Sequence, residues 1–97
     1  MYSSIRRYTT SPDDAAAIIG LIKKGNIEGR IGEIPGFVSY YIVDCGEGVL
    51  LTINVFEDRA DAERSNAIAA EWVKEYVLPN YSLSPPEVAV GKIVLNA

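Results

Sequence analysis

IPGFVSYYIVDCGEGVLLTINVF is the stretch from residue 34 to residue 56, and EDRADAERSNAIAAEWVKEYV continues it to residue 77. Its two apolar runs, residues 37–43 and 49–56, are rich in β-branched and aromatic side chains, which is typical of strands. The five residues between them include two glycines, so the stretch predicts an antiparallel hairpin. Immediately before the hairpin, Pro35 and Gly36 break any helix and favour a turn.

The second strand of this hairpin is apolar on both faces. One face carries Val49, Leu51, Ile53 and Val55, and the other carries Leu50, Thr52, Asn54 and Phe56. A strand that faces water on one side shows a polar face, so both faces should be covered. A chain of 97 residues has too few elements for two covers. We therefore expect helices on one face and the sheet of a second copy on the other, in a two-fold homodimer.

A helix is predicted to follow the hairpin, from an N-cap at Asp58 to about Val77, before Pro79 stops it. On a helical wheel one side collects the apolar residues Ala62, Ala69, Val73, Tyr76 and Val77. The opposite side collects Glu63, Arg64, Glu71, Lys74 and Glu75. The helix is thus amphipathic, and its small residues allow close approach to a sheet.

The first third of the chain predicts a strand and then a helix. Residues 2–9 alternate as a strand does, with Ser4, Arg6 and Tyr8 on one side. Ser11 is suited to cap a helix that begins at Pro12. That helix buries one face, made by Ala15, Ile18, Ile19 and Ile22, and reaches a stop signal at Gly25. For residues 26–33 a kinked continuation of the helix competes with a loop, and we favour the continuation.

The last third predicts an irregular connection and a final strand. Residues 78–86 hold three prolines, and residues 87–96 alternate again. The order of elements is β-α-β-β-α-β, which is the ferredoxin-like α+β arrangement of a four-stranded antiparallel sheet with two helices on one face. We expect residues 1–97 to form a single domain, and two copies to form a homodimeric α/β barrel.

The composition and charge of the chain exclude several classes of binding partner. The chain is 48% hydrophobic and carries a net charge of −4, so it has no electrostatic reason to bind nucleic acid or an anionic membrane. It shows no secretory signal and no apolar run long enough to span a bilayer. The single cysteine, Cys45, cannot form an internal disulfide. We expect a cytoplasmic protein without a membrane partner.

The chain contains no histidine, which excludes several kinds of catalytic and metal site. A His-bearing catalytic triad, a proximal-His haem site and the common zinc sites all need an imidazole or several thiolates. We therefore expect no metal and no cofactor. Cys45 has no neighbouring cation in sequence to lower its pKa, so a catalytic thiol is not expected. The glycines at positions 46 and 48 join two strands, so they indicate a turn rather than a phosphate cradle.

Two residues on the predicted second helix are candidates for chemistry. Asn66 falls near the middle of the apolar arc, where an amide needs a hydrogen-bond partner. The structural interpretation is a bond to nearby backbone or a neighbouring side chain, and the functional one is an amide that orients a ligand. Trp72 lies at the edge of the arc, where the indole either packs in the core or lines a cavity between helix and sheet. For both residues the structural interpretation is the more common one.

Four further residues are candidate ligand contacts: Tyr40, Tyr41, Asn54 and Arg6. Tyrosines on a sheet are common at sheet-to-sheet interfaces, which is the structural alternative for the first two. Arg6 could bind an acidic ligand, but pairing with a carboxylate of the chain is the favoured interpretation.

The segments Ile34-Pro35-Gly36-Phe37, Tyr40-Tyr41, Val55-Phe56-Glu57-Asp58 and Ala69-Ala70-Glu71-Trp72-Val73 occur in an informative order. Together they resemble small bacterial proteins of the antibiotic-biosynthesis monooxygenase-like, dimeric α/β-barrel superfamily. The resemblance covers most of the chain and implies a homodimer with two sheets packed face to face. Its members include cofactor-independent oxygenases of phenolic polyketides, and Asn66 and Trp72 lie in the region comparable to their pocket. The haem-opening members require a histidine, which this chain lacks.

Two functions follow as hypotheses. The first is a cofactor-independent monooxygenase-like domain that binds a small aromatic or phenolic molecule between the sheet and the second helix. In this hypothesis Asn66 and Trp72 position the molecule, and Tyr40 or Tyr41 assists. The second is a non-catalytic dimeric binding or stress-related module, whose apolar surface serves mainly for self-association. The volume beside Trp72 distinguishes the two.

Overall fold

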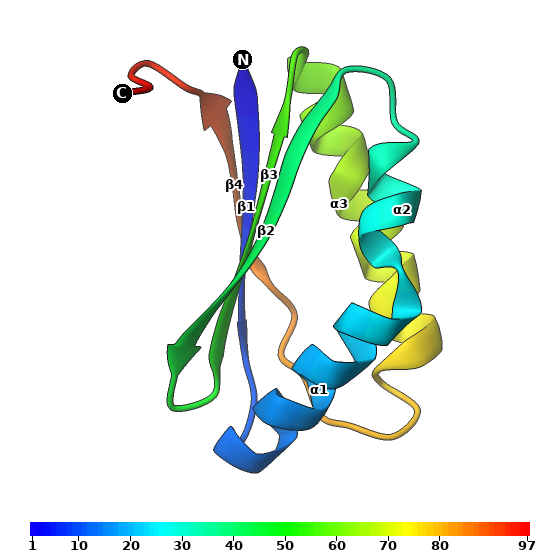
Figure 1. The fold of residues 1–97 in the computed structure, drawn as a ribbon. Helices are drawn as coiled ribbons and strands as arrows, with labels where there is room; N and C mark the ends of the chain where they lie inside the picture. Colours follow the sequence, from blue (N-terminus) through cyan, green and yellow to red (C-terminus); the bar gives the residue numbers. More distant parts are fainter.

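The computed structural model describes all of residues 1–97. Along the chain it contains β1 (Tyr2–Thr9), α1 (Pro12–Gly25), α2 (Ile27–Gly32), β2 (Phe37–Gly46), β3 (Val49–Phe56), α3 (Arg59–Tyr76) and β4 (Glu87–Lys92). The four strands form one sheet in the order β2-β3-β1-β4, and every neighbouring pair is antiparallel. All helices lie on one side of the sheet (Figure 1). The predicted ferredoxin-like α+β fold is confirmed.

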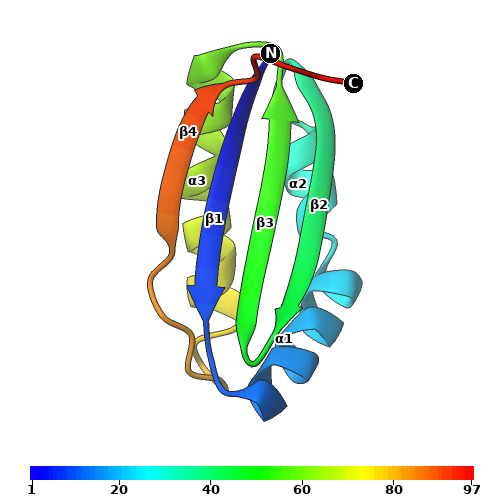
Figure 2. The same cartoon turned by 90° about the vertical axis from the view of Figure 1, so that its left-hand side faces the viewer.

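The two faces of the sheet differ in cover. Turned by 90°, the sheet faces the viewer with the helices behind it and no element in front (Figure 2). On β3 the residues that face the helices are buried, and they are Leu50, Thr52, Asn54 and Phe56. The alternate residues are only half-buried, and they are Val49, Leu51, Ile53 and Val55. The helices of the chain therefore cover only one of the two apolar faces of β3, and the other face is open.

The kinked continuation predicted after the first helix is confirmed. Ser11 caps α1 by accepting a hydrogen bond of 3.1 Å from the Asp14 backbone N–H. Asn26 then adopts a left-handed conformation, with φ of 55°, and the short helix α2 starts after it. Asparagine tolerates this conformation better than other side chains, which explains why the helix breaks here.

The hairpin turn is tighter than the sequence suggested. Strand β2 runs on to Gly46, which leaves only Glu47 and Gly48 between the strands. Three consecutive residues have positive φ, at 80°, 54° and 82°, which glycine accommodates at two of the three positions. The Gly48 carbonyl accepts a bond of 2.8 Å from the Thr10 N–H. The turn is thereby fastened to the junction between β1 and α1.

Helix α3 matches its predicted bounds, but its buried face is rotated from the expected one. The buried residues are Ala62, Ser65, Ala69 and Trp72. The prediction that Tyr76 belongs to the buried side is wrong, because its side chain is 41% exposed and stacks under the Arg30 guanidinium. Asp58 occupies the N-cap position, but its side chain makes no capping hydrogen bond.

The final strand is shorter than predicted. Strand β4 ends at Lys92, which pairs with Tyr2 at the very start of β1. Beyond that point a single further hydrogen bond follows, from the Ile93 N–H to the Met1 carbonyl at 2.9 Å, and residues 93–97 lie outside any strand. The predicted extension to residue 96 is therefore wrong. Val94 and Leu95 are 88% and 84% exposed. No helix of the structure combines the length and the apolar character needed to cross a bilayer.

Candidate functional site

Arg6 occupies the centre of the layer between sheet and helices. Its side chain is only 1% exposed. One terminal nitrogen, Nη1, donates to Asn66 Oδ1 at 2.8 Å and to Ser65 Oγ at 3.3 Å, and the other, Nη2, donates to Asn54 Oδ1. The prediction that Arg6 pairs with a carboxylate is wrong, because every hydrogen-bond partner of its guanidinium is a neutral side chain. The guanidinium instead joins β1, β3 and α3 through hydrogen bonds.

Asn66 makes its contacts with side chains of β1. Its Oδ1 accepts from Arg6 and, at 2.6 Å, from the Ser4 hydroxyl. The structural interpretation of this amide, a bond to neighbouring side chains, is what the geometry shows. Asn66 therefore fixes the orientation of Arg6.

A small cavity lies beside Arg6, between the sheet and α3. Its volume is about 20 Å³, which is enough for one water molecule. Five polar or aromatic side chains contribute to its wall: Arg6, Tyr8, Tyr40, Thr52 and Trp72. The remaining wall is aliphatic and comes from the helices, the sheet and the connection after α3, through residues such as Ile22, Leu50 and Leu83.

Three buried hydrogen-bond donors on this wall have no partner. They are Arg6 Nε, Thr52 Oγ1 and Trp72 Nε1. A buried donor without an acceptor costs about 1–3 kcal/mol, and more when it is charged. Such groups are rare in folded proteins unless a water, ion or ligand satisfies them. The cavity is therefore equipped to hold an acceptor.

Both cavity tyrosines are held in their neutral form. Burial raises the pKa of Tyr40 to about 12, and the nearby Arg6 guanidinium only partly offsets this effect. Burial likewise raises the pKa of Tyr8 above its usual range, again against the opposing influence of Arg6. At neutral pH neither phenol supplies negative charge, so the cation of Arg6 stays uncompensated.

The structure brings together most of the residues singled out from the sequence. Arg6, Asn54 and Asn66 form one hydrogen-bonded group, and Tyr40 joins Trp72 on the cavity wall. Trp72 is 1% exposed and belongs to the buried face of α3, whereas the sequence placed it at the edge of the apolar arc. The centroid of its ring lies 5.3 Å from the ring centroid of Tyr76.

Tyr41 does not join this group. It is 56% exposed and lies on the open face of the sheet, paired across the strands with Ile53. Sequence reasoning missed Ser4, Tyr8 and Ser65 as members of the site. A signal for two of them was present, since the alternation of residues 2–9 places Ser4 and Tyr8 on the same side as Arg6.

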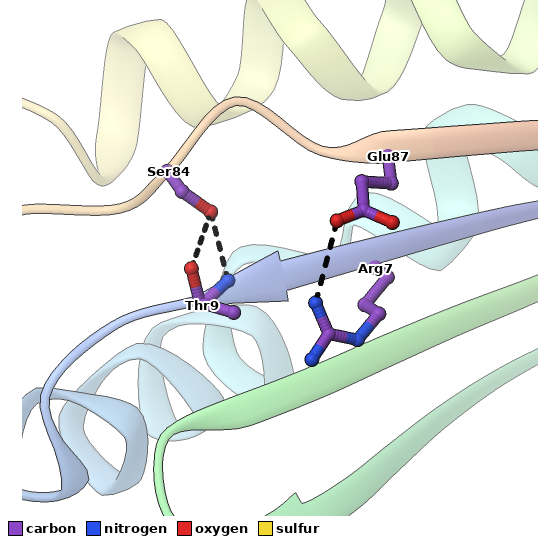
Figure 3. Close-up of polar contacts among 4 residues, drawn as sticks. All are labelled: Arg7, Thr9, Ser84 and Glu87. Carbon is purple, nitrogen blue, oxygen red and sulfur yellow. Dashed lines mark hydrogen bonds and ion pairs between the residues drawn. The ribbon is translucent and has the colours of Figure 1, made fainter.

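A larger surface hollow adjoins the cavity. This hollow has a volume of about 210 Å³ and shares Tyr8, Val73 and Leu83 with the cavity wall. The connection that carries Leu83 is fastened to the end of β1. Ser84 Oγ lies 2.9 Å from both the backbone nitrogen and the hydroxyl of Thr9 (Figure 3), and the Ser84 N–H donates to the Thr9 carbonyl at 3.0 Å.

No group of three or more histidine, cysteine, aspartate or glutamate side chains is arranged to hold a metal ion. The site is thus built from a cation, amides, hydroxyls and aromatic rings. Groups of these kinds pack against aromatic rings and stabilise negative charge.

The sequence matches no model of a known protein family and no curated protein. Solved structures, in contrast, share the fold. A putative antibiotic biosynthesis monooxygenase from Nitrosomonas europaea superposes with a TM-score of 0.72 at 14% identity, over 96% of this chain and 89% of that one. SnoaB, a cofactor-independent oxygenase from Streptomyces nogalater, gives a TM-score of 0.64 at 15% identity, over 98% and 94%.

A dimeric ferredoxin-like protein from an uncultured marine organism also shares the fold, with a TM-score of 0.72 at 10% identity, over 99% of this chain and 95% of that one. The resemblance to antibiotic-biosynthesis monooxygenase-like proteins is thus confirmed for the fold. At these identities the likeness concerns the fold alone.

Proposed function

We propose that this chain is a cofactor-independent monooxygenase-like domain, whose substrate is a small aromatic or phenolic molecule bound between the sheet and α3. The observation that carries the proposal is the cavity beside Trp72, where unpartnered buried donors meet an aromatic and aliphatic wall. The shared fold with a cofactor-independent oxygenase supports it.

The oxidation of a phenol to a quinone balances without any reductant besides the substrate. One C–H bond and the O–H bond of the phenol break, one atom of O₂ becomes the new carbonyl oxygen, and the other leaves as water. The substrate gives up the four electrons that O₂ accepts. Removal of the phenolic proton makes the ring electron-rich, and a fixed cation stabilises the charge that develops. In this scheme Arg6 supplies that cation, Asn66 positions it and Trp72 packs against the ring.

The cavity must widen to accept such a ring. A benzene-sized guest fills a cavity on the order of 150 Å³, whereas the present volume is about 20 Å³. Leu83 is the natural gate, because its displacement joins the cavity to the neighbouring hollow of about 210 Å³. The hydrogen bonds between Thr9 and Ser84 hold this gate closed.

The gate is tested with two variants whose side chains appear together in Figure 3. Ser84→Ala removes both side-chain bonds to Thr9 and keeps the backbone bond, so a phenol should associate and dissociate faster in stopped-flow measurements. Glu87→Gln removes only the exposed ion pair with Arg7, at 3.5 Å, and should leave the rates unchanged. Equal rates in wild type and Ser84→Ala would exclude this entrance.

Oxygen uptake tests the activity itself. The assay supplies a panel of phenols and follows both O₂ consumption and the mass of the product. We expect activity in the wild type, a loss of at least tenfold in Trp72→Phe and Asn66→Ala, and little change in Tyr76→Phe, whose side chain is exposed. Uptake that is absent with every phenol, or that is unaffected by the first two variants, contradicts the proposal.

The alternative is a non-catalytic dimeric module, and one observation favours it. The space beside Trp72 is largely filled, since the cavity has room for only about one water. In that case the fold serves self-association, and Trp72→Phe should change stability without any effect on ligand binding.

Both functions share a proposed homodimer through the open face of the sheet. That face has a broad hollow of about 780 Å³, lined by residues such as Val38, Tyr41 and Val55. A dimeric protein of this fold supports the arrangement. Light scattering at micromolar concentration should show a dimer. Ile53→Glu on the open face should disrupt the dimer, and Ala67→Glu, at an exposed position of α3, should not. A monomeric wild type would refute it.

A further inference from the structure

Arg6 is the only arginine of the chain without a carboxylate beside it. The other four arginines each lie 3.0 to 3.9 Å from a glutamate or aspartate oxygen. Arg6 is 1% exposed, and the acceptors of its two terminal nitrogens are two amides and a hydroxyl. A buried charge is normally paired, because its removal from water is costly. The interior around Arg6 therefore lacks one negative charge.

The cavity beside Arg6 is also lined by hydrogen-bond donors that have no acceptor. Arg6 Nε and Trp72 Nε1 are donors only, and the third unpartnered group is the Thr52 hydroxyl. The exposed fractions of these three side chains are 1%, 1% and 5%. Tyr8 and Tyr40 keep their protons at neutral pH, because burial raises the pKa of both phenols. No carboxylate lines the cavity.

The size of the cavity restricts what it holds without widening. Its volume is about 20 Å³, which is room for one water molecule. A carboxylate, a phosphate or an aromatic ring exceeds this volume. A water molecule would bring two hydrogens of its own and would leave the charge of Arg6 unpaired. A monatomic anion accepts several hydrogen bonds, donates none and supplies the missing charge.

We infer that this cavity is a halide site, which binds chloride through Arg6 Nε, Trp72 Nε1 and the Thr52 hydroxyl. Arg6 Nε is free for this role, because Nη1 and Nη2 already donate to amide and hydroxyl oxygens. Fluoride holds its hydration shell more tightly than the larger halides, so the site should prefer chloride and bromide. The ligand is an inorganic ion, and the inference does not rest on the proposed oxidation of a phenol.

The stability of the wild type tests the site in solution. A ligand that binds only the folded state raises the free energy of unfolding once its concentration exceeds the dissociation constant. Urea unfolding is therefore measured in sodium chloride and in sodium fluoride, at equal ionic strength and one protein concentration. General salt effects favour the more strongly hydrated fluoride, whereas a chloride site should make the protein more stable in chloride. Equal stability in the two salts, or greater stability in fluoride, overturns the inference.

The fluorescence of Trp72 reports where the ion binds, because this residue is the single tryptophan of the chain. A bromide ion beside the indole should quench it as a heavy atom, whereas bromide in the solvent cannot contact a side chain that is 1% exposed. The quenching should therefore saturate, and chloride should reverse it while fluoride should not. Quenching that is absent, that does not saturate or that chloride does not reverse overturns the inference.

Three variants assign the binding to the donors of the cavity. Arg6→Met removes the charge and should abolish the effect of chloride on stability. Thr52→Val removes only a hydroxyl and should raise the dissociation constant of chloride about tenfold. Arg7→Met is the control, because the charge of Arg7 is exposed and pairs with Glu87 at 3.5 Å, so this variant should respond as the wild type does.

The wild-type and Thr52→Val measurements decide the question even where Arg6→Met does not fold. A chloride response of wild-type strength in Thr52→Val, or in a folded Arg6→Met, overturns the inference. Loss of the response in Arg7→Met overturns it as well, because the ion would then bind on the open face of the sheet.

Discussion

Replacement of Gly25 by alanine tests the packing that closes the cavity from the side of α1. A Cβ at this position would lie 2.4 Å from Trp72 Cζ2 and 3.2 Å from Cε2. Carbon atoms do not approach so closely, and Trp72 is fixed because it is 1% exposed. Overpacking of this kind costs about 1–3 kcal/mol. The higher helix propensity of alanine returns at most about 1 kcal/mol, so we expect Gly25→Ala to lower the free energy of unfolding.

Gly20 is the matched control, because it lies in the same helix and a Cβ there would have nothing within 4 Å. Gly20→Ala should raise the free energy of unfolding by about 0.5–1 kcal/mol. The two variants should therefore differ by at least about 1 kcal/mol. Urea unfolding followed by circular dichroism measures both, at one fixed protein concentration, because association alters apparent stability.

A double-mutant cycle assigns the cost to its cause. Trp72→Phe removes the ring atoms that the new Cβ would meet, so Gly25→Ala should cost much less in that background. The reasoning is refuted if Gly25→Ala proves as stable as Gly20→Ala. It is equally refuted if the cost of Gly25→Ala is the same with phenylalanine at position 72.

Three further outcomes are expected. In urea unfolding, Gly46→Ala should lower the free energy of unfolding by about 1–2 kcal/mol, and Gly48→Ala should lower it by several times as much. Both glycines have positive φ, but only a Cβ at position 48 would lie 1.9 Å from a backbone carbonyl oxygen. Tyr40 has a folded pKa of about 12 against an ordinary 10.0, so the folded state keeps a proton that the unfolded state loses as the pH rises between these values. The free energy of unfolding should fall by roughly 2–3 kcal/mol across this window, and Tyr40→Phe should remove that part of the fall. Ser11→Ala should cost about 1 kcal/mol and Asp58→Ala only a few tenths, since only Ser11 makes a capping hydrogen bond.

The fold could be predicted because its determinants are local. The β-branched and apolar run of residues 49–56, the cap at Ser11 and the break at Pro35 each act within a few residues of the chain. The details that were wrong depend on neighbours that are distant in sequence. Strand β4 ends at Lys92, opposite Tyr2 at the start of β1, and Tyr76 is turned outward because the α3 face centred on Trp72 packs inward.

The site was harder to predict because its hydrogen bonds join residues far apart in the chain. Arg6 is separated by 48 residues from Asn54 and by 60 from Asn66. Hydropathy alone indicated that the Arg6 side chain is either exposed to solvent or paired with a carboxylate, since charged residues are seldom fully buried. Nothing in the residues next to Arg6 indicates otherwise.

The burial of one arginine does follow, however, from topology combined with alternation. In the ferredoxin-like order the first strand lies in the middle of the sheet, and here β1 is flanked by β3 and β4. Successive side chains of a strand point to opposite faces, so of two adjacent arginines at the centre of such a strand, one must face the helices. Arg6 shares its side with Ser4 and Tyr8, whereas Arg7 emerges on the open face and meets Glu87 at 3.5 Å. An arginine pair in a central strand therefore places a positive charge in the core, and here the fold meets it with the neutral oxygens of Asn54, Ser65 and Asn66.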